Sequence, residues 1–116
     1  MSRTALQVME DHSAKMATQD PDVILQDYAQ DAVVLTNLSC QPLVGHQAIR
    51  TFIQRLLSDG VLQRMESAPT EMLYLEGREG KATQVFRKTG TPIFGSETYV
   101  VENDLIVFES AYITLD

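Results

Sequence analysis

The last change in the spacing of this chain's apolar residues comes close to Gly60. Before that point most of them recur at intervals of three and four residues, which is the spacing of one helix face. After it no helical period returns, and apolar runs alternate with short turn-forming segments. Because the helical part precedes the strand part instead of alternating with it, the sequence predicts an α+β domain whose helices cover one face of a curved antiparallel sheet.

Three helices are predicted in the first half of the chain. The first covers about 4–18, and Asp20-Pro21 ends it, because the residue before a proline disfavours helical backbone. Pro21 suits the first position of a second, short helix over 21–29. A third amphipathic helix runs from Gly45 to about 58–60. The residues expected to pack it against the sheet are Ile49, Phe52, Ile53 and Leu56.

Strands are predicted from β-branched and apolar runs. One lies at 31–38, before the third helix, and the others lie at 61–65, 72–75, 82–86, 93–101 and 105–115. Turn-forming residues at 77–80, 88–92 and 102–104 separate the later runs. Connections of this length favour antiparallel pairing of consecutive strands.

Size and charge exclude several classes of protein. Residues 1–116 are expected to form a single domain, since 116 residues is an ordinary domain length. The net charge of −7 repels phosphate backbones and anionic lipids, so neither nucleic acid nor a membrane is an expected partner. Residues 1–20 contain no continuous apolar stretch, which argues against a signal peptide there and makes a cytoplasmic location the expectation. Cys40 is the single cysteine and cannot form an internal disulfide.

Three local phrases occur along this order of elements. They are DPDVILQDYAQDAVV at 20–34, PLVGHQAIRTF at 42–52 and YVVENDLIVFESAY at 99–112. Together they resemble the SnoaL-like polyketide cyclases and ketosteroid isomerases of the nuclear-transport-factor-2-like (NTF2-like) superfamily, over about residues 4–115. The resemblance implies a cone-shaped α+β barrel. Three N-terminal helices would pack on a strongly curved antiparallel or mixed sheet, with an apolar pocket at the open end. Since such folds carry many functions, function depends on the pocket residues.

Similarity to the ketosteroid isomerases places His12 and Thr36 in the pocket. His12 falls where those enzymes have a hydrogen-bond-donating tyrosine; the alternative is a half-exposed histidine at the edge of a helix face. Thr36 falls where they have the catalytic aspartate. A threonine hydroxyl is no base near neutral pH, which counts against the isomerase mechanism. The alternative is a strand threonine with no chemical role.

Glu97 is the main catalytic candidate that the resemblance implies, because it aligns with an acidic position of the later strands. In an apolar cone, burial raises the pKa of a carboxyl group and lets it exchange a proton at neutral pH. With His12 it would form a carboxylate–histidine pair. A strand register shifted by one residue would instead point Glu97 to solvent. Secondary pocket candidates for ligand binding are Tyr28, Glu109 and Tyr112; the two tyrosines could equally be core or dimer-surface residues.

These observations predict a small-molecule pocket protein of the SnoaL-like kind. It would act by proton transfer on a hydrophobic substrate, as an isomerase, cyclase or dehydratase without a cofactor. The alternative is a non-catalytic ligand-binding or dimerisation module. His12 and His46 are far apart in sequence, and no motif with metal-ligand spacing accompanies them, so no metal is expected. The last strands are apolar at both parities, which predicts a homodimer through the outer sheet face.

Overall fold

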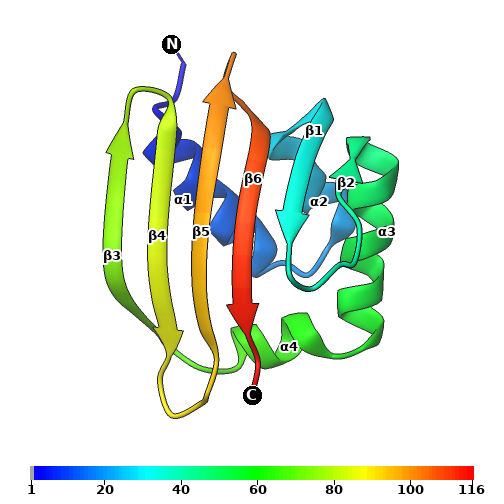
Figure 1. Cartoon of the computed structure of the whole chain (residues 1–116), viewed down its shortest axis with the longest axis vertical. Coiled ribbons are helices and arrows are strands. Elements are labelled where there is room, and N and C mark those ends of the chain that lie inside the picture. Colours follow the sequence, from blue (N-terminus) through cyan, green and yellow to red (C-terminus); the bar gives the residue numbers. More distant parts are fainter. Residues whose placement is uncertain (1) are drawn as a thin grey trace.

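The first two helices of this chain lie behind a single sheet, and the later two lie beside and below it in the view of Figure 1. The computed structural model describes residues 2–116. The helical elements are α1 (Ala5–Met16), α2 (Pro21–Ile24), the 3₁₀ turn η1 (Leu25–Asp27), α3 (Gly45–Ser58) and α4 (Val61–Glu66). The strands are β1 (Tyr28–Thr36), β2 (Leu43–Val44), β3 (Thr70–Arg78), β4 (Lys81–Lys88), β5 (Phe94–Glu102) and β6 (Leu105–Thr114). The predicted cone-shaped α+β architecture is confirmed.

The sheet is mixed, with six strands in the order β2-β1-β6-β5-β4-β3. All neighbouring strands are antiparallel except β1 and β6, which run parallel. The register of three pairs shifts part-way along: β1 with β6, β3 with β4, and β5 with β6. Bulges of this kind increase the local twist of a sheet. The strands thereby bend around the helices and leave one concave and one outer face (Figure 1).

Local sequence explains where α1 and α2 begin. Thr4 caps α1 by accepting a hydrogen bond from the backbone of Gln7, whose side chain accepts one from the backbone of Thr4. This reciprocal arrangement satisfies two N–H groups that a helix start otherwise leaves unpaired. Asp20 caps α2, and Pro21 occupies its first turn.

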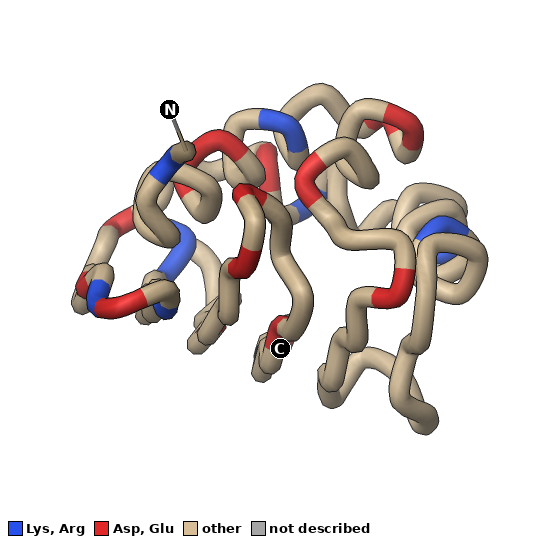
Figure 2. Tube along the Cα trace, turned by 90° about the horizontal axis from the view of Figure 1, so that it is seen from above, with Lys and Arg blue, Asp and Glu red and all other residues tan. Residues whose placement is uncertain are grey.

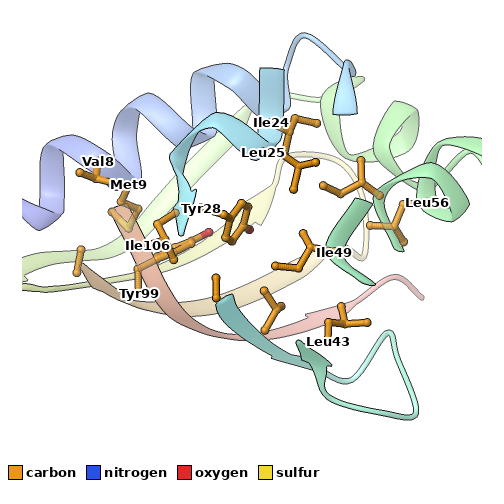
Figure 3. Packing of buried hydrophobic residues seen from close by; sticks show 14 of the residues in the cluster. Val8, Met9, Ile24, Leu25, Tyr28, Leu43, Ile49, Leu56, Tyr99 and Ile106 are labelled. Atoms are coloured by element: carbon orange, nitrogen blue, oxygen red, sulfur yellow. The ribbon is translucent and has the colours of Figure 1, made fainter. Parts of the chain in front are cut away.

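The main core lies between the helices and the concave face of the sheet (Figure 3). Val8 and Met9 of α1 are buried there, together with Ile49 and Leu56 of α3. Ile53 is buried as predicted, whereas Phe52 is half-buried at the edge of the same cluster. A smaller cluster of Phe86, Ile93 and Ile113 lies apart from the main core.

Two of the predicted segments differ from the structure, and the short strand β2 was not predicted. The run at 61–65, predicted as a strand, is helix α4. Gly60 has a φ of 76°, a left-handed conformation that lets the chain end α3 and begin a new helix at once. The second predicted helix is shorter than 21–29, because α2 ends at Ile24 and η1 at Asp27. Tyr28 therefore starts a strand and does not belong to a helix.

Two hairpin turns have the expected chemistry. Glu79 and Gly80 join β3 to β4 with φ values of 46° and 80°. Asn103 and Asp104 join β5 to β6 with φ values of 52° and 70°. Two successive residues with positive φ match the right-handed twist of the flanking strands. The predicted antiparallel pairing of these strands is confirmed.

Charged residues are distributed over the whole trace. Figure 2 shows Lys and Arg positions scattered among Asp and Glu positions. The sequence has 9 Lys and Arg residues and 16 Asp and Glu residues. None of the helices within residues 2–116 is long and apolar enough to cross a membrane.

Candidate functional site

A cavity of about 360 Å³ opens between the helices and the concave face of the sheet. Its volume lies within the range of small-molecule binding sites. Aliphatic, aromatic and methionine side chains form most of its wall: Met16, Val34, Leu38, Ile49, Phe52, Ile53, Leu56, Leu62, Met65, Met72, Phe86, Ala111 and Ile113. The polar side chains of the wall are His12, Ser13, Tyr28, Thr36, Glu66, Thr70, Gln84, Lys88, Glu97, Tyr99 and Glu109.

Glu97 lies on β5 and is held by two hydrogen-bond donors. Gln84, which is opposite it on β4, donates from Nε2 to Glu97 Oε1 over 2.6 Å. The hydroxyl of Tyr99 donates to the same oxygen over 3.2 Å. Burial raises the pKa of Glu97 above its ordinary 4.5, and the hydrogen bonds from Gln84 and Tyr99 oppose that shift. The two donors therefore favour the ionised form of a carboxyl group that burial disfavours.

Glu109 lies on β6, diagonally across from Glu97, because Glu97 pairs with Ala111 and Tyr99 pairs with Glu109. It accepts a hydrogen bond from the hydroxyl of Tyr28, at the start of β1. Burial and the nearby Glu97 raise the pKa of Glu109 to about 8. Glu109 is therefore largely protonated at neutral pH, beside a second carboxyl group with a different set of partners.

His12 completes this polar cluster from α1. Its Nε2 lies 3.3 Å from the hydroxyl oxygen of Tyr28, and its ring meets those of Tyr28 and Tyr99 edge-on. Burial lowers the pKa of His12 to about 4, so the imidazole is neutral at neutral pH. Nδ1 is buried and has no hydrogen-bond partner among residues 2–116. Because the hydroxyl of Tyr28 donates to Glu109, its oxygen can accept a hydrogen bond from His12 when the imidazole carries its proton on Nε2.

The structure places five of the six sequence-predicted residues on the cavity wall: His12, Tyr28, Thr36, Glu97 and Glu109. Tyr112 lies instead on the outer face of β6 with 57% of its surface exposed. The strand alternation explains this difference from the predicted pocket position, since its neighbours Ala111 and Ile113 face inward.

The sequence predicted a pair between His12 and Glu97, but no hydrogen bond within residues 2–116 joins them. His12 meets Tyr28, which in turn donates to Glu109. Glu97 is bonded to Gln84 and Tyr99. The carboxyl group linked to the histidine is thus Glu109, a secondary candidate in the sequence analysis, and the link runs through a tyrosine.

Thr36 is half-buried, and its hydroxyl oxygen accepts a hydrogen bond from the backbone of Leu38 over 3.2 Å. This is a local turn contact after β1. It uses the hydroxyl for backbone geometry, as expected of a strand threonine without an acid–base role.

Six polar wall residues were missed from the sequence: Ser13, Glu66, Thr70, Gln84, Lys88 and Tyr99. Gln84, Phe86 and Lys88 are buried at alternate positions of β4, and that period of two could have assigned them to one face. Within residues 2–116 no three His, Cys, Asp or Glu side chains gather in a way that could hold a metal ion.

Sequence comparison finds no relative: no family model matches this chain, and no curated protein matches it. Solved structures do resemble it. An NTF2-like protein of unknown function from Burkholderia xenovorans LB400 is 18% identical, with a TM-score of 0.69 over 95% of this chain and 82% of that one. A SnoaL-like protein of unknown function from Burkholderia thailandensis is 14% identical, with a TM-score of 0.70 over 95% and 93%.

A third structure, from Kribbella flavida, is provisionally assigned as a ketosteroid isomerase. It is 10% identical to this chain, with a TM-score of 0.68 over 100% of this chain and 83% of that one. At these identities the likeness concerns the fold and not the chemistry of the site. The chain accordingly has the NTF2-like fold that the sequence phrases suggested.

Proposed function

We propose that this NTF2-like chain binds an apolar small molecule in its cavity and transfers protons on it, with Glu97 as the base and Glu109 as the acid. One observation carries the proposal. Two carboxyl groups lie close together on the wall of an apolar cavity, and neither forms an ion pair with a cation of residues 2–116. Paired acids whose surroundings favour different protonation states are a usual arrangement for acid–base work.

The base is assigned to Glu97 because its donors, Gln84 and Tyr99, stabilise the carboxylate. It is half-buried and lines the cavity, so a bound molecule can reach it. The raised pKa of Glu97 makes it a stronger base than an exposed glutamate once it is ionised.

The acid is assigned to Glu109 because its pKa of about 8 keeps it protonated at neutral pH. A neutral carboxyl group can donate a hydrogen bond or a proton to an oxygen that gains negative charge. Since the His12 imidazole is neutral, its proposed role is to position Tyr28 beside Glu109 and not to act as a base.

The reaction class that suits this pair is proton abstraction next to a carbonyl group. Glu97 would take a proton from the carbon beside the carbonyl, and the electron pair of that C–H bond would move towards the carbonyl oxygen. Glu109 would donate a proton to that oxygen, which gives an enol. Return of the Glu97 proton to another carbon of a conjugated enol, with return of the enol O–H proton to Glu109, re-forms the carbonyl and completes an isomerisation. If the next carbon bears a leaving group, that group departs with the electron pair of its bond to carbon while the enol proton returns to Glu109, which completes an elimination.

A second function is a ligand-binding module without catalysis. The observation that favours it is Thr36, whose hydroxyl is engaged with the backbone of Leu38 where the resembled isomerases have their base. In that case the cavity holds its ligand, and the two carboxyl groups serve only as hydrogen-bonding groups.

The test is exchange of the α-hydrogens of 2-decanone for deuterium in D₂O, followed by proton NMR. Enolisation needs no other substrate, so this ketone probes the proposed chemistry directly. Glu97→Gln keeps the side-chain shape, removes the base, and should reduce the exchange rate by ~10²-fold or more. Glu102→Gln, an exposed change at the end of the same strand, is the matched control.

Binding is followed separately with N-phenyl-1-naphthylamine, a neutral apolar fluorophore. It should bind wild type and Glu97→Gln with equal affinity. Binding of this probe without enolisation of 2-decanone or of a wider set of ketones would favour the binding module. Equal exchange rates in wild type and Glu97→Gln would remove Glu97 from the mechanism.

We further propose that two copies pair through the outer face of the sheet. Leu35, Val44, Phe94 and Tyr112 expose between 37% and 62% of their surface on the strands. An apolar face of this kind favours association with a second, identical face. Tyr112→Glu should convert a dimer to a monomer in light scattering at micromolar concentration, while Gln54→Glu on the exposed side of α3 should not. A monomeric wild type would contradict the proposal.

A further inference from the structure

Lys88 is a buried cation on the wall of the cavity. It lies at the end of β4, on the same strand face as Gln84 and Phe86. Only 7% of its surface is exposed. A lysine is rarely buried to this degree unless an opposite charge is beside it, because removing an ammonium group from water is unfavourable.

No carboxylate of residues 2–116 forms an ion pair with Lys88. Its Nζ donates to the hydroxyl of Thr70 over 2.7 Å and lies 3.5 Å from the backbone oxygen of Ala68. Both partners are neutral. An ammonium group has three donors, so at least one of them has no partner in the described chain.

The position of Lys88 separates it from the acid–base pair. Gln84, which bonds Glu97, lies four residues before Lys88 on the same strand. At about 3.3 Å per residue, their Cα atoms are about 13 Å apart. Phe86 lies between them and gives that part of the wall an apolar surface. The cavity therefore has a carboxyl end and a cationic end joined by an apolar wall.

One further charged residue lines the cavity. Glu66, at the end of α4, is exposed and can keep its carboxylate in solvent. The chain as a whole attracts cations and repels anions, since its net charge is −7. A buried ammonium group inside an acidic protein is thus a local feature that the overall charge does not predict.

We propose that Lys88 binds an anionic group of the cavity ligand, a carboxylate or a sulfonate, and so selects elongated apolar molecules with one charged end. This inference rests on the proposed function, because it assumes that the cavity holds an apolar ligand. The anion supplies the counter-charge that Lys88 lacks. It also fixes the direction of the ligand, whose uncharged end then lies at Glu97 and Glu109.

For the proposed proton transfer this geometry names a substrate class. The substrate is an apolar keto acid, or a similar carbonyl compound, whose carbonyl and anionic group lie at opposite ends of an apolar chain. A substrate without the anionic group should bind more weakly and in more than one orientation.

The experiment compares two fluorophores with the same rings. 1-Anilinonaphthalene-8-sulfonate carries an anionic group, and N-phenyl-1-naphthylamine lacks it. Lys88→Met should weaken binding of the sulfonate by ~10-fold or more, since hydrogen bonds to charged groups are stronger than neutral ones. The neutral probe should bind both proteins with the same affinity. Added sodium chloride should weaken the binding of the sulfonate and leave the binding of the neutral probe unchanged.

Arg87→Met is the matched control. Arg87 precedes Lys88, points to the opposite, exposed side, and has Glu71 as a partner at 3.5 Å. It should leave both probes unaffected. If Arg87→Met weakens the sulfonate more than Lys88→Met does, the probe binds the outer surface and the inference is wrong.

Two further variants keep the test decisive. If Lys88→Met unfolds, Lys88→Gln retains a donor for Thr70 without the charge, and it should show the same loss of sulfonate binding. Glu66→Gln removes one negative charge at the cavity and should strengthen sulfonate binding by a smaller factor.

The failures of the two proposals are distinguishable. If the neutral probe binds wild type but the affinity of the sulfonate is unchanged in Lys88→Met and Lys88→Gln, the proposal of an anionic subsite is wrong and the cavity proposal stands. If neither probe binds wild type, the apolar cavity ligand is wrong, and the role of Lys88 falls with it. Octanoate displacing the sulfonate better than octanol does would extend the result to carboxylates.

Discussion

Two neighbouring residues, Asp27 and Tyr28, belong to two polar clusters that differ in charge compensation: the carboxylate of Asp27 has cations beside it, and the carboxyl groups near Tyr28 do not. Asp27 is 1% exposed, and its Oδ1 accepts from Arg3 and from Lys15, each over 3.0 Å. Tyr28 belongs to the cavity, where Glu97 and Glu109 have tyrosine, glutamine and histidine neighbours and no ion-pair partner among residues 2–116. Helix α1 contributes to both clusters, since Lys15 bonds Asp27 and His12 lies 3.3 Å from the hydroxyl oxygen of Tyr28.

The comparison separates a stabilising carboxylate from reactive ones. Asp27 has opposite charges beside it, Arg3 and Lys15, and its ion pair with Lys15 ties α1 to the segment before β1. The same Arg3 also reaches Asp104, and its backbone and side-chain contacts hold the pKa of Asp104 below its ordinary value. The cavity carboxyl groups have no such compensation, so their burial is unfavourable for folding. Groups that lower stability in this way are commonly retained for function.

The largest expected effect is on the ion-paired cluster. Asp27→Asn removes the charge that Arg3 and Lys15 share, and it should lower the free energy of unfolding by about 3 kcal/mol. Urea denaturation at pH 7 measures this loss. The control is Asp11→Asn, because Asp11 pairs with the same guanidinium over 2.9 Å but has 52% of its side chain exposed. A surface pair of that kind contributes less than about 1 kcal/mol. Equal losses in the two variants would show that burial does not distinguish the clusters.

The second expected effect is on the pH dependence of stability. The pKa of Glu109 is raised to about 8 in the folded chain. Between its ordinary value and about 8 the folded state therefore holds a proton that the unfolded state has released. Stability must fall as pH rises through this window. The lowered pKa of His12, about 4 when folded, acts in the opposite direction but only below about pH 6.5.

The window between pH 7 and 8 therefore isolates the carboxyl groups. Wild type should lose about 1 kcal/mol of unfolding free energy between these two pH values, and Glu109→Gln should lose less. Glu97→Gln should also flatten the profile, because the Glu97 charge is one cause of the raised pKa of Glu109. A slope unchanged in both variants would mean that the cavity carboxyl groups are ionised like exposed ones.

Sequence patterns located most of the fold because the helices and hairpins have local signals. The stripe of Ile49, Ile53 and Leu56 predicted α3, and turn residues such as Asn103 and Asp104 predicted the hairpins. The run at 61–65 was misassigned because five residues are too few to separate a period of 3.6 from a period of 2. Its helical start depends on the left-handed backbone of Gly60, which composition alone does not show.

The candidate site could be predicted only in part, for a physical reason. The resemblance identified Glu97 and Glu109 as pocket candidates, but the side chains that they contact depend on strand register. Gln84 meets Glu97 through the pairing of β4 with β5. Tyr28 meets Glu109, 81 residues later, through the parallel pairing of β1 with β6. No local pattern encodes contacts across that separation, so the predicted partner of Glu97 was His12.

The smallest expected effect concerns Tyr28, which stands at the junction of the two clusters. Tyr28→Phe removes the donor that lowers the pKa of Glu109, so that pKa should rise further. The pH-dependent loss of stability should then move to higher pH, with a loss of about 1 kcal/mol at pH 6 from the unpaired Nε2 of His12. Carbon-13 NMR of the Glu109 carboxyl group measures the shift directly.

Tyr99→Phe is the matched change, because Tyr99 donates to Glu97 instead. It should raise the pKa of Glu97 and, by removing negative charge near Glu109, lower that of Glu109. Opposite shifts of Glu109 in the two variants would show that the tyrosines set which carboxyl group holds the proton. A shift of Glu109 in the same direction in both would show that burial alone decides it, and the assignment of Glu97 as base and Glu109 as acid would then lose its support.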